Sequence, residues 1–503
     1  MPSPPPGSPT PPIAIAGGAA NARPALTGAT TVEVPDHVLE RLRSACSEVT
    51  TDPEVLAETS RDWWPLAMCW ATEGRVPALA SAVCRPADAA EVAAVLAVCN
   101  TATVPVTPAA GRSGVLGGSV PVHGGVVLDL TAMSGIVDVD VTSHVLDVRA
   151  GTFGTPLEEE LRQAHNMTIG HWPQSMDLST VGGWLACRGA GQFSNRYGKI
   201  EDIVIGLDVV LADGRQITTG GPPRQAVGPD LNQLFVGSEG TLGVITGARL
   251  RLHNAPTDHD RTAWGFTTFA AALDAQRRIV QRGGHPAVLR LYDAAEAQRS
   301  YETAEGVNLL LAYDEGDLAM VEVNLRIVDE VCEELHAEVA DERLVDHWMA
   351  KRNDVAALEA LISRGYVVDT MEVAGRWRDL TTIYDATTSA LLSIPGTIAA
   401  TAHQSHSYID GACLYFTFAG KVEESERTTY HAALWDAGQR AALAAGAALS
   451  HHHGVGLARS RFVAKALGPA FDVLVATKAA LDPNGILNPG KLGLPDPFGG
   501  VSW

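Results

Sequence analysis

The 503-residue sequence contains no uninterrupted apolar run of about 18 or more residues, the length that a membrane-spanning helix requires. Its N-terminus, MPSPPPGSPTPP, has neither the basic start nor the apolar core of a secretory signal. We therefore expect no integral membrane segment and no export by that route.

Cysteines are few and lack a pattern. The seven stand at positions 46, 69, 84, 99, 187, 332 and 413, without CxxC spacing. This arrangement indicates neither a disulfide framework nor a zinc site, and it favours a reduced, cytoplasmic setting. We expect no metal site.

Positive charge is also in deficit. The chain has 37 Lys and Arg against 58 Asp and Glu, a net charge of −21 and a pI near 5.1. Nucleic acids and anionic membranes would repel such a chain, so we expect neither as a partner. The expected partner is a small-molecule substrate, and a homodimer is left open.

Glycine, by contrast, is abundant and clustered. Three stretches, Pro108–Gly118, Gly170–Gly198 and Gly237–Thr246, are too rich in glycine for the interior of a helix or strand. Each is attached to a strand-like run. One such loop could be only a tight turn, but three together predict one extended ligand held by backbone N–H groups.

The hydrophobic patterns divide the chain into five parts. Residues 1–31, rich in Pro and Gly, are expected to be a disordered tail, and residues 32–75 an N-terminal helical segment. Alternating strands and helices follow over 76–253, longer helical patterns over 254–470, and a turn-rich segment over 471–503 that returns to the 76–253 domain. The predicted fold class is α+β.

Six motifs occur in a fixed order: PAAGRSG, GHWPQSMDLSTVGGW, RYGKIEDIV, GPDLNQLFVGSEGTLGVIT, SHHHGVG and LDPNGILNPGKLG. This series resembles the vanillyl alcohol oxidase and p-cresol methylhydroxylase (PCMH) flavoprotein family, most of all its alkyldihydroxyacetonephosphate synthase branch. The resemblance spans roughly residues 75–495 and is thin between 254 and 400. It implies a two-lobed PCMH-type FAD-binding domain over 76–253 and an α+β substrate domain, or cap, over 254–470.

The resemblance also implies a bound FAD. In some relatives a histidine in the first loop bonds covalently to the flavin, but this loop contains none, so non-covalent FAD is expected. The residues that the resemblance assigns to FAD are Pro108, Ala109, Ala110, Gly111, Arg112, Ser113, Gly114, Pro173, Gln174, Ser175, Met176, Asp177, Leu178, Ser179, Gly182, Gly183, Cys187, Arg188, Gly189, Ala190, Glu239, Gly240, Thr241, Leu242, Gly243, Val244, Ile245 and Asn488.

Acid and base groups are expected in the cap. The tract His451, His452, His453 suits a proton relay or base, although a metal-binding or exposed polar tract is the simpler alternative. In an extended segment His451 and His453 would share one face and His452 the other. The resemblance implies catalysis by this tract.

Two further residues match functional positions of the family. Tyr415 corresponds to its proton donor or acceptor, although a tyrosine in a strand usually packs in a core. Arg290 corresponds to an arginine needed for activity, with an ion pair to Asp293 or Glu296 as an equally weighted alternative. His403 and His406 could line the same pocket, and at least one of them is expected to be structural.

The sequence departs from the synthase branch at one position. Where that branch has an arginine that holds the substrate phosphate, the alignment places Leu358, with Arg352 and Arg364 nearby but out of register. Leucine offers no donor to a phosphate dianion, so the ether-lipid substrate is in doubt.

Three functions are consistent with these residues. The first is an FAD-dependent oxidoreductase that oxidises a small polar substrate, a 2-hydroxy acid, alcohol or amine, by hydride transfer to flavin N5. The second is a synthase-like transferase that forms an ether bond without net redox change. The third is a flavin-binding protein without turnover, which the histidine tract and Tyr415 disfavour.

Overall fold

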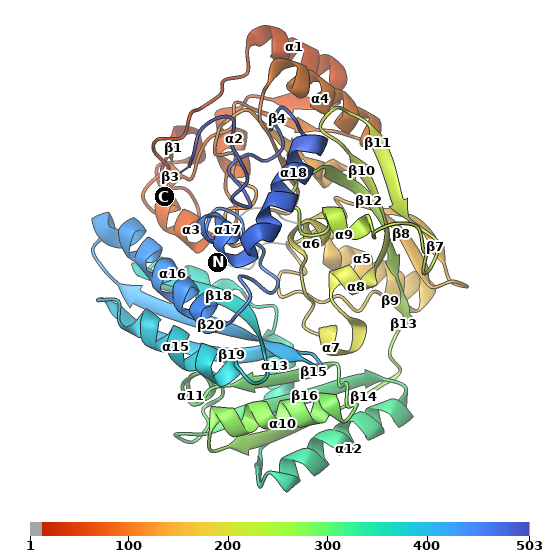
Figure 1. Cartoon of the computed structure of the whole chain (residues 1–503), viewed down its shortest axis with the longest axis vertical. Helices are drawn as coiled ribbons and strands as arrows, with labels where there is room; N and C mark the ends of the chain where they lie inside the picture. The colour runs from red at the N-terminus through yellow and green to blue at the C-terminus, as the bar shows by residue number, and fades with distance from the viewer. Residues whose placement is uncertain (1–12, 502–503) are drawn as a thin grey trace.

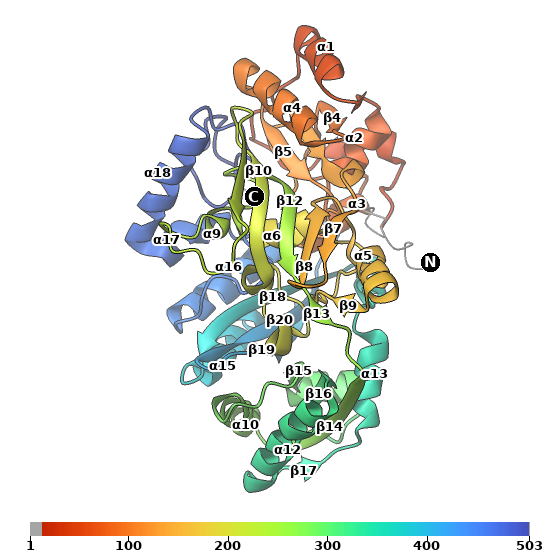
Figure 2. The same ribbon diagram turned by 90° about the vertical axis from the view of Figure 1, so that its right-hand side faces the viewer.

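The computed structural model describes residues 13–501 and shows two domains stacked along the long axis (Figure 1). The N-terminal half forms the upper domain, the green to mid-blue part of the chain forms the cap below it, and the dark blue C-terminal part returns to the upper domain. Figure 2 shows the cap sheet below the five-stranded sheet of the upper domain. The predicted α+β class is confirmed.

The first lobe of the upper domain is a four-stranded sheet in the order β2 (Glu48–Thr50), β4 (Ala82–Arg85), β6 (Val126–Asp129) and β5 (Val106–Ala109). The last three strands are parallel. All four residues of β6 are buried, as expected for a central parallel strand. Helix α4 (Ala89–Ala102) begins where the Asp88 side chain accepts the N–H groups of Ala90 and Glu91, and together with α1 (Asp36–Ala45) it packs into the core of this lobe.

The second lobe is an antiparallel five-stranded sheet. Its order is β11 (Gln216–Gly220), β10 (Val204–Val210), β12 (Val244–Arg251), β8 (Val145–Arg149) and β7 (Ile136–Asp140). Helix α6 (Val181–Cys187) packs its apolar side chains into the core of this sheet. The glycine stretches adjoin the ends of β5, α6 and β12, so both lobes contribute to the same region.

The cap is built on an antiparallel seven-stranded sheet. The order is β17 (Glu338–Val339), β14 (Asp258–Phe266), β16 (Asn308–Gly316), β15 (Val288–Tyr292), β19 (Thr397–Ser407), β20 (Gly411–Lys421) and β18 (Tyr366–Arg376). Helices α10 (Phe269–Gln281), α12 (Leu318–Glu334), α15 (Leu380–Leu392) and α16 (Arg427–Ala444) pack against it and share one apolar core with its strands.

The pleat of this sheet separates core side chains from polar ones. Leu291, Ala402 and Leu414 belong to the core shared with the helices. Because successive side chains on a strand point to opposite faces, the neighbouring residues Tyr292, His403 and Tyr415 point to the other face. The face of the sheet opposite these four helices therefore carries these three polar side chains, beside an apolar cluster that includes Leu309, Leu311 and Trp348.

The N-terminal segment differs from its prediction. Ile13 and Ile15 are 6% and 5% exposed, and β1 (Arg23–Pro24) pairs with β3 (Arg75–Val76). Arg61 Nη1 also donates to the Ile13 carbonyl over 2.6 Å. The expectation of a disordered tail is thus wrong for residues 13–31, because two isoleucines and buried backbone bonds fix the chain. Residues 1–12 lie outside the described part.

Three tryptophans of the N-terminal helical segment, Trp63, Trp64 and Trp70, are buried, as a core or seam position requires. Trp70 Nε1 donates to Thr428 Oγ1 on α16 over 2.9 Å. This bond ties the N-terminal segment to the cap.

The C-terminal segment returns to the first lobe after α18 (Phe471–Leu481). Val106 N–H donates to the Ile486 carbonyl and Asn488 N–H to the Val106 carbonyl, both over 2.8 Å, along the edge of β5. Lys478 Nζ, 6% exposed, donates to the Thr241 carbonyl. The last residues are thus built into the glycine-stretch region.

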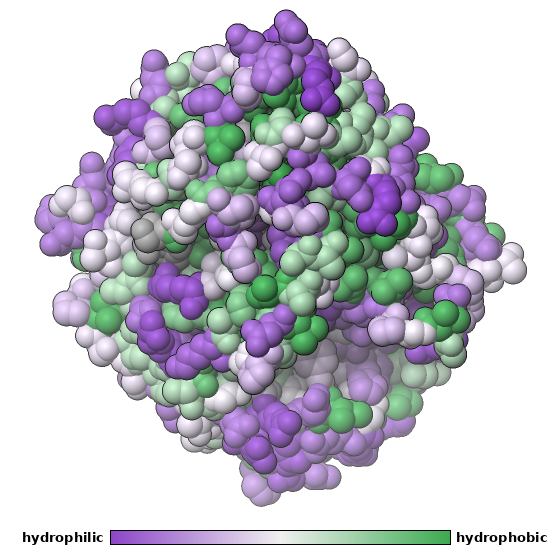
Figure 3. Space-filling model, turned by 45° about the horizontal axis from the view of Figure 1, so that its top comes forward, coloured by the Kyte–Doolittle hydropathy of each residue, from purple (hydrophilic) through white to green (hydrophobic). Residues whose placement is uncertain are grey.

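Across residues 13–501, none of the helices combines the length and the apolar character needed to cross a bilayer. In the face shown in Figure 3, hydrophilic side chains gather over the two ends of the molecule and hydrophobic ones are scattered between them. A homodimer stays a prediction.

Candidate active site at the domain seam

The three glycine stretches converge. A Cβ added at Gly111 would lie 2.1 Å from the Leu178 carbonyl oxygen, and one at Gly240 would lie 3.0 Å from Pro108 Cγ. Asn488 Nδ2 donates to the carbonyls of Gly118 and Glu239 over 3.0 and 2.7 Å. The first stretch therefore touches both others, and the C-terminal segment closes the group.

Buried polar atoms without partners among the described residues lie in the same region. They include Arg112 Nε, Thr180 Oγ1, Ser238 Oγ and Asn488 Oδ1. Leaving such a group unpaired costs about 1–3 kcal/mol, so a polar ligand that bonds them would be stabilised. These atoms and the glycines without Cβ fit an extended, phosphate-bearing ligand such as FAD.

Not every side chain of the predicted FAD set faces this region. Four apolar members pack in the cores of the two lobes and offer only backbone groups: Met176, Leu242, Val244 and Ile245. Leu178 is also buried. Several polar members bond to the protein, among them Arg112 to Asp129, Asp177 to Thr155 and Arg188 to Gln233. These side chains shape the loops.

The histidine loop, Ser450–Gly456, is organised by one carboxylate. Glu372 Oε1, on β18, accepts the backbone N–H groups of His451, His452 and His453 over 3.1, 2.9 and 2.7 Å. Three successive N–H groups on one oxygen require a curled backbone. The expected extended segment with alternating faces is therefore wrong, and the imidazoles cluster, with ring centroids 5.0 Å (His451 to His452) and 4.5 Å (His452 to His453) apart.

A buried cation balances this carboxylate. Arg459 Nη2 bonds Glu372 Oε2, and both side chains are fully buried. Burial alone would raise the pKa of Glu372, but Arg459 and the nearby His453 hold it well below its usual value. Glu372 is therefore ionised at neutral pH.

A second carboxylate holds the other end of the loop. Glu239 Oε1 accepts the N–H of Val455, and Glu239 Oε2 accepts that of Gly456 over 2.9 Å. Leu457 N–H donates to the Leu116 carbonyl of the first stretch over 2.7 Å. The first and third glycine stretches therefore both contact this part of the chain.

The imidazoles form a hydrogen-bonded chain. His452 Nδ1 lies 2.8 Å from His451 Nδ1, and His451 Nε2 lies 2.7 Å from the Tyr408 hydroxyl. Burial lowers the pKa of both histidines well below the usual value. The neighbouring Lys199 lowers the pKa of His451 further, and His453 lowers that of His452. Neutral imidazoles at pH 7 are able to accept a proton.

The second glycine stretch reaches the same cluster. Ser194 Oγ lies 2.6 Å from His406 Nδ1, and Lys199, directly after this stretch, donates from Nζ to the His451 carbonyl over 2.8 Å. One ligand nitrogen each from His406, His451 and His452 lies within 4.8 Å of the others, close enough to share a metal ion. The expectation of no metal stays a prediction.

A row of four paired residues crosses the cap sheet beside the histidine loop. Tyr292 pairs with His403, His403 with Tyr415, and Tyr415 with Glu372. The His403 and Tyr415 rings stack with centroids 4.7 Å apart. Tyr415, placed by β20, donates to Thr370 Oγ1 over 3.1 Å, and burial raises its pKa above the usual value, so the phenol stays protonated.

Arg290 lies at the end of this row. Its Nη2 donates to His403 Nε2 and its Nε to the Tyr292 hydroxyl, both over 2.6 Å. The other ring nitrogen of His403, Nδ1, lies 2.9 Å from Glu296 Oε1. Within residues 13–501, Arg290 makes no direct ion pair with a carboxylate, so the expected alternative of a pair with Asp293 or Glu296 is not what the geometry shows.

Leu358 does not lie in this cluster. It packs on the apolar cluster that contains Ile13 and Ile15, away from the histidines. Arg352 stacks on Trp172 and Phe193, with its guanidinium carbon 5.3 and 5.1 Å from the ring centroids, and so borders the second glycine stretch.

Sequence reasoning did not find Glu372, Arg459, Lys199 or Glu296 as site residues. Glu372 carries a signal, since it is one of two acids in the strand segment VVDTMEV, whose other residues are mainly apolar. Its partner Arg459 is 87 residues away in the sequence, so only the fold reveals the pair.

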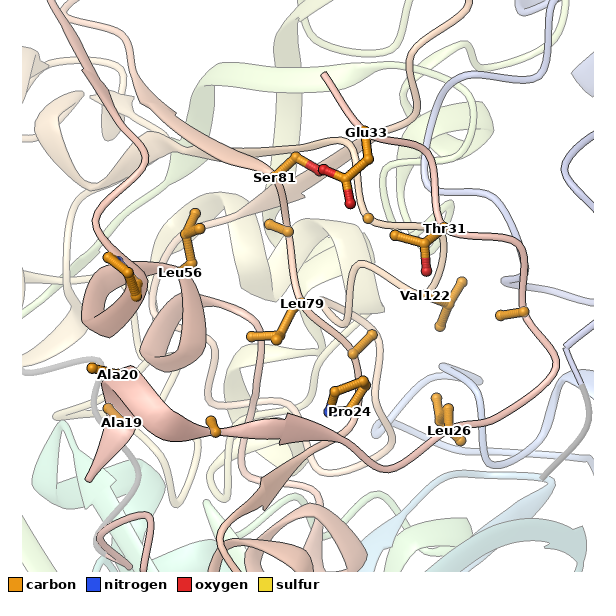
Figure 4. A pocket seen from close by; sticks show the side chains of 16 residues that line it. Ala19, Ala20, Pro24, Leu26, Thr31, Glu33, Leu56, Leu79, Ser81 and Val122 are labelled. Carbon is orange, nitrogen blue, oxygen red and sulfur yellow. The ribbon is translucent and has the colours of Figure 1, made fainter. Parts of the chain in front are cut away.

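The molecule also has a cavity of about 430 Å³ between the N-terminal segment and residues 78–81, which precede β4, shown in Figure 4. Its lining is mostly apolar, and two of its polar side chains, Glu33 and Ser81, bond to each other over 3.3 Å. Its lining residues contain no cluster of acid and base groups, so it is not the candidate active site.

Two family models match the chain. One, described as FAD binding domain, matches residues 80–220, and the other, described as FAD linked oxidases, C-terminal domain, matches residues 255–492. The chain is also 31% identical over 430 residues to the uncharacterized FAD-linked oxidoreductase YgcU of Escherichia coli, covering 82% of this chain and 88% of that relative. The chain belongs to the FAD-linked oxidoreductase family. Its cofactor is FAD, as expected.

Other relatives of the chain differ in activity. Alkyldihydroxyacetonephosphate synthase of Trypanosoma brucei brucei is 26% identical, covering 88% of this chain and 77% of that protein. Glycolate oxidase subunit GlcD of Bacillus subtilis is 28% identical, covering 82% and 88%. The relatives therefore include both a synthase and an oxidase subunit.

The fold matches p-cresol methylhydroxylase with substrate bound, at a TM-score of 0.76 and 18% identity over 93% of this chain and 99% of that one. The expected PCMH-type FAD-binding domain with a cap is confirmed.

Proposed function

We propose that this protein is an FAD-dependent oxidoreductase that oxidises a small polar substrate, with a 2-hydroxy acid as the favoured class and an alcohol or amine as the wider one. The observation that carries the proposal is Arg290, a cation without a carboxylate partner among residues 13–501, beside a cluster of neutral imidazoles. A carboxylate placed against this guanidinium would gain a charge-assisted bond.

The chain's own residues then have separate roles. Arg290 binds the substrate anion. His403 receives an Arg290 N–H at Nε2 and faces Glu296 at Nδ1, so it fixes the direction of the guanidinium. Tyr415 stacks on His403 and, as a protonated phenol, offers a donor to a substrate oxygen when it leaves Thr370.

The base is His452. In one tautomer, His452 Nδ1–H donates to His451 Nδ1, and His451 Nε2–H donates to the Tyr408 hydroxyl. This tautomer leaves His452 Nε2 free to accept a proton. His452 would take the proton of the substrate hydroxyl or amine. FAD supplies the hydride acceptor at N5.

The flavin cradle would be formed by the converging stretches, with FAD held without a covalent bond. Of the assigned residues, Gly111, Ser113, Gly114 and Gly240 would offer backbone N–H groups, and Asn488 its Oδ1, which has no partner within the described chain. This assignment is supported by the unpaired buried polar atoms around the cradle.

Glycolate, the substrate in the name of the GlcD relative, is a 2-hydroxy acid, which supports the favoured class. The alternative is a transferase like alkyldihydroxyacetonephosphate synthase, which would make an ether bond without net redox change. It is favoured by the histidine tract, which resembles that branch, and disfavoured by the leucine at position 358.

The test is anaerobic mixing of the purified protein with 2-hydroxy acids, alcohols and amines while the visible flavin absorbance is followed. Bleaching by a 2-hydroxy acid, weakened in R290M, supports the proposal. No bleaching by any member of the panel, with an alkyl ether formed from acyl dihydroxyacetone phosphate and a fatty alcohol, would replace it with the synthase.

A further inference from the structure

The histidine loop has two anchors of different origin. Glu372 belongs to the cap and holds the N–H groups of residues 451–453. Glu239 belongs to the third glycine stretch and holds those of Val455 and Gly456. The loop therefore connects the cap to the flavin cradle through side chain to backbone bonds.

The two anchors differ in what fixes them. Glu372 sits in an eleven-residue strand and is paired with Arg459, both fully buried. Its position depends on the cap and the segment that carries Arg459. Glu239 lies between Gly237 and Gly240, both with positive φ, in a stretch without regular structure.

The backbone of Glu239 is itself in an unusual conformation. Its φ is +50°, in the left-handed region that residues with a Cβ adopt at a cost. This conformation aims the carboxylate at the loop, where a Cβ added at Gly454 would lie 2.4 Å from Glu239 Oε1. Glycine at 454 thus makes room for the carboxylate.

The same residue also borders the cradle. The Glu239 carbonyl accepts Asn488 Nδ2 over 2.7 Å, and its neighbour Gly240 packs on Pro108 of the first stretch. A ligand that rests on these stretches restricts the φ and ψ angles of Glu239 and so the direction of its carboxylate.

We propose that Glu239 is a positioning residue that couples FAD binding to the order of the histidine loop. With FAD bound, the carboxylate is fixed and both ends of the loop are held. Without FAD, the bonds of Glu372 and Lys199 to residues 451–453 remain, and the Val455 end of the loop loosens. Because coupling is reciprocal, the anchored loop also strengthens FAD binding. The inference does not depend on which substrate is oxidised.

Hydrogen exchange tests the coupling without any activity. In the wild-type protein, amides of residues 450–456 should exchange at least about tenfold more slowly after FAD is added to the apoprotein, with the largest change at Val455 and Gly456. Equal exchange with and without FAD would overturn the proposal.

The variant E239Q separates coupling from folding. Glutamine keeps one acceptor oxygen and replaces the other by a donor, so one of the two loop bonds is lost. We expect E239Q to lose the FAD-dependent slowing at Val455 and Gly456 and to bind FAD about tenfold more weakly by flavin fluorescence titration. E160Q, at an exposed position of the same domain, is the matched control.

A second variant covers the case in which E239Q does not fold. E239D keeps the charge but withdraws the carboxylate by one methylene, and we expect an intermediate loss of both FAD affinity and FAD-dependent protection. Wild-type protection and affinity in either variant would show that Glu239 has no positioning role.

Discussion

Replacing Glu372 by glutamine should destabilise the cap mainly by stranding Arg459. In E372Q the amide oxygen of the new side chain can still accept the three loop N–H groups, but its amide NH₂ then faces the Arg459 guanidinium, donor against donor. In the wild type both side chains of the pair are fully buried. Removing one partner from such a pair costs about 3–5 kcal/mol of unfolding free energy, because the remaining charge is buried without compensation.

The double variant E372Q/R459M separates this cost from the loss of the loop anchor. It removes the stranded cation while the amide oxygen at position 372 still holds the loop. The double variant should therefore lose less unfolding free energy than the two single variants lose together, by at least about 1 kcal/mol. Urea unfolding of all four proteins, with native-state hydrogen exchange in β18 and β20 to locate the effect, measures the difference. If the double variant lost as much unfolding free energy as the two single variants together, the coupling that we ascribe to this pair would be refuted.

Four further results are expected. R290M should raise the KM for a 2-hydroxy acid by about 10- to 100-fold because one charge-assisted contact is lost. R290K should restore part of the affinity, and the KM for an uncharged alcohol should change little. An equal rise in KM for both substrates would contradict anion binding. Because the pKa of Glu372 is held low in the folded state, its ionised carboxylate stabilises the fold above about pH 4.3, and this stabilisation is lost as pH falls from that value towards the folded pKa. The urea midpoint should therefore fall over that range in the wild type, and fall less in E372Q. G111A should push the first two glycine stretches apart and yield colourless protein, whereas G500A, which adds its Cβ in open space, should stay yellow. Acid precipitation should release all FAD into the supernatant; yellow precipitate would show a covalent bond.

The alternation of strands and helices could be predicted because its signal is local. The run DAAEVAAVLAVCNTA forms α4, capped by Asp88, and FAAALDAQRRIVQ forms α10. Periodicity and capping act within one or two turns, so they are visible in the sequence.

The shape of the histidine loop could not be predicted in this way. Its curl depends on Glu372, which is 80 residues before His452, and on Glu239, which is 216 residues before Val455. The order of residues 13–31 could not be predicted for a related reason, since Ile13 and Ile15 are only two apolar side chains in a Pro- and Gly-rich stretch and their pocket is formed by later residues.

The placement of Asn488 and Lys478 has a consequence for synthesis. The cradle region bonds to residues that are synthesised after all three glycine stretches and the cap, through Asn488 to Gly118 and Glu239 and through Lys478 to Thr241. A nascent chain that ends before residue 478 has all three glycine stretches but lacks the piece that locks them together. We therefore expect the protein to capture its flavin only once residues 478–488 have been synthesised, and a product truncated before residue 478 to remain colourless.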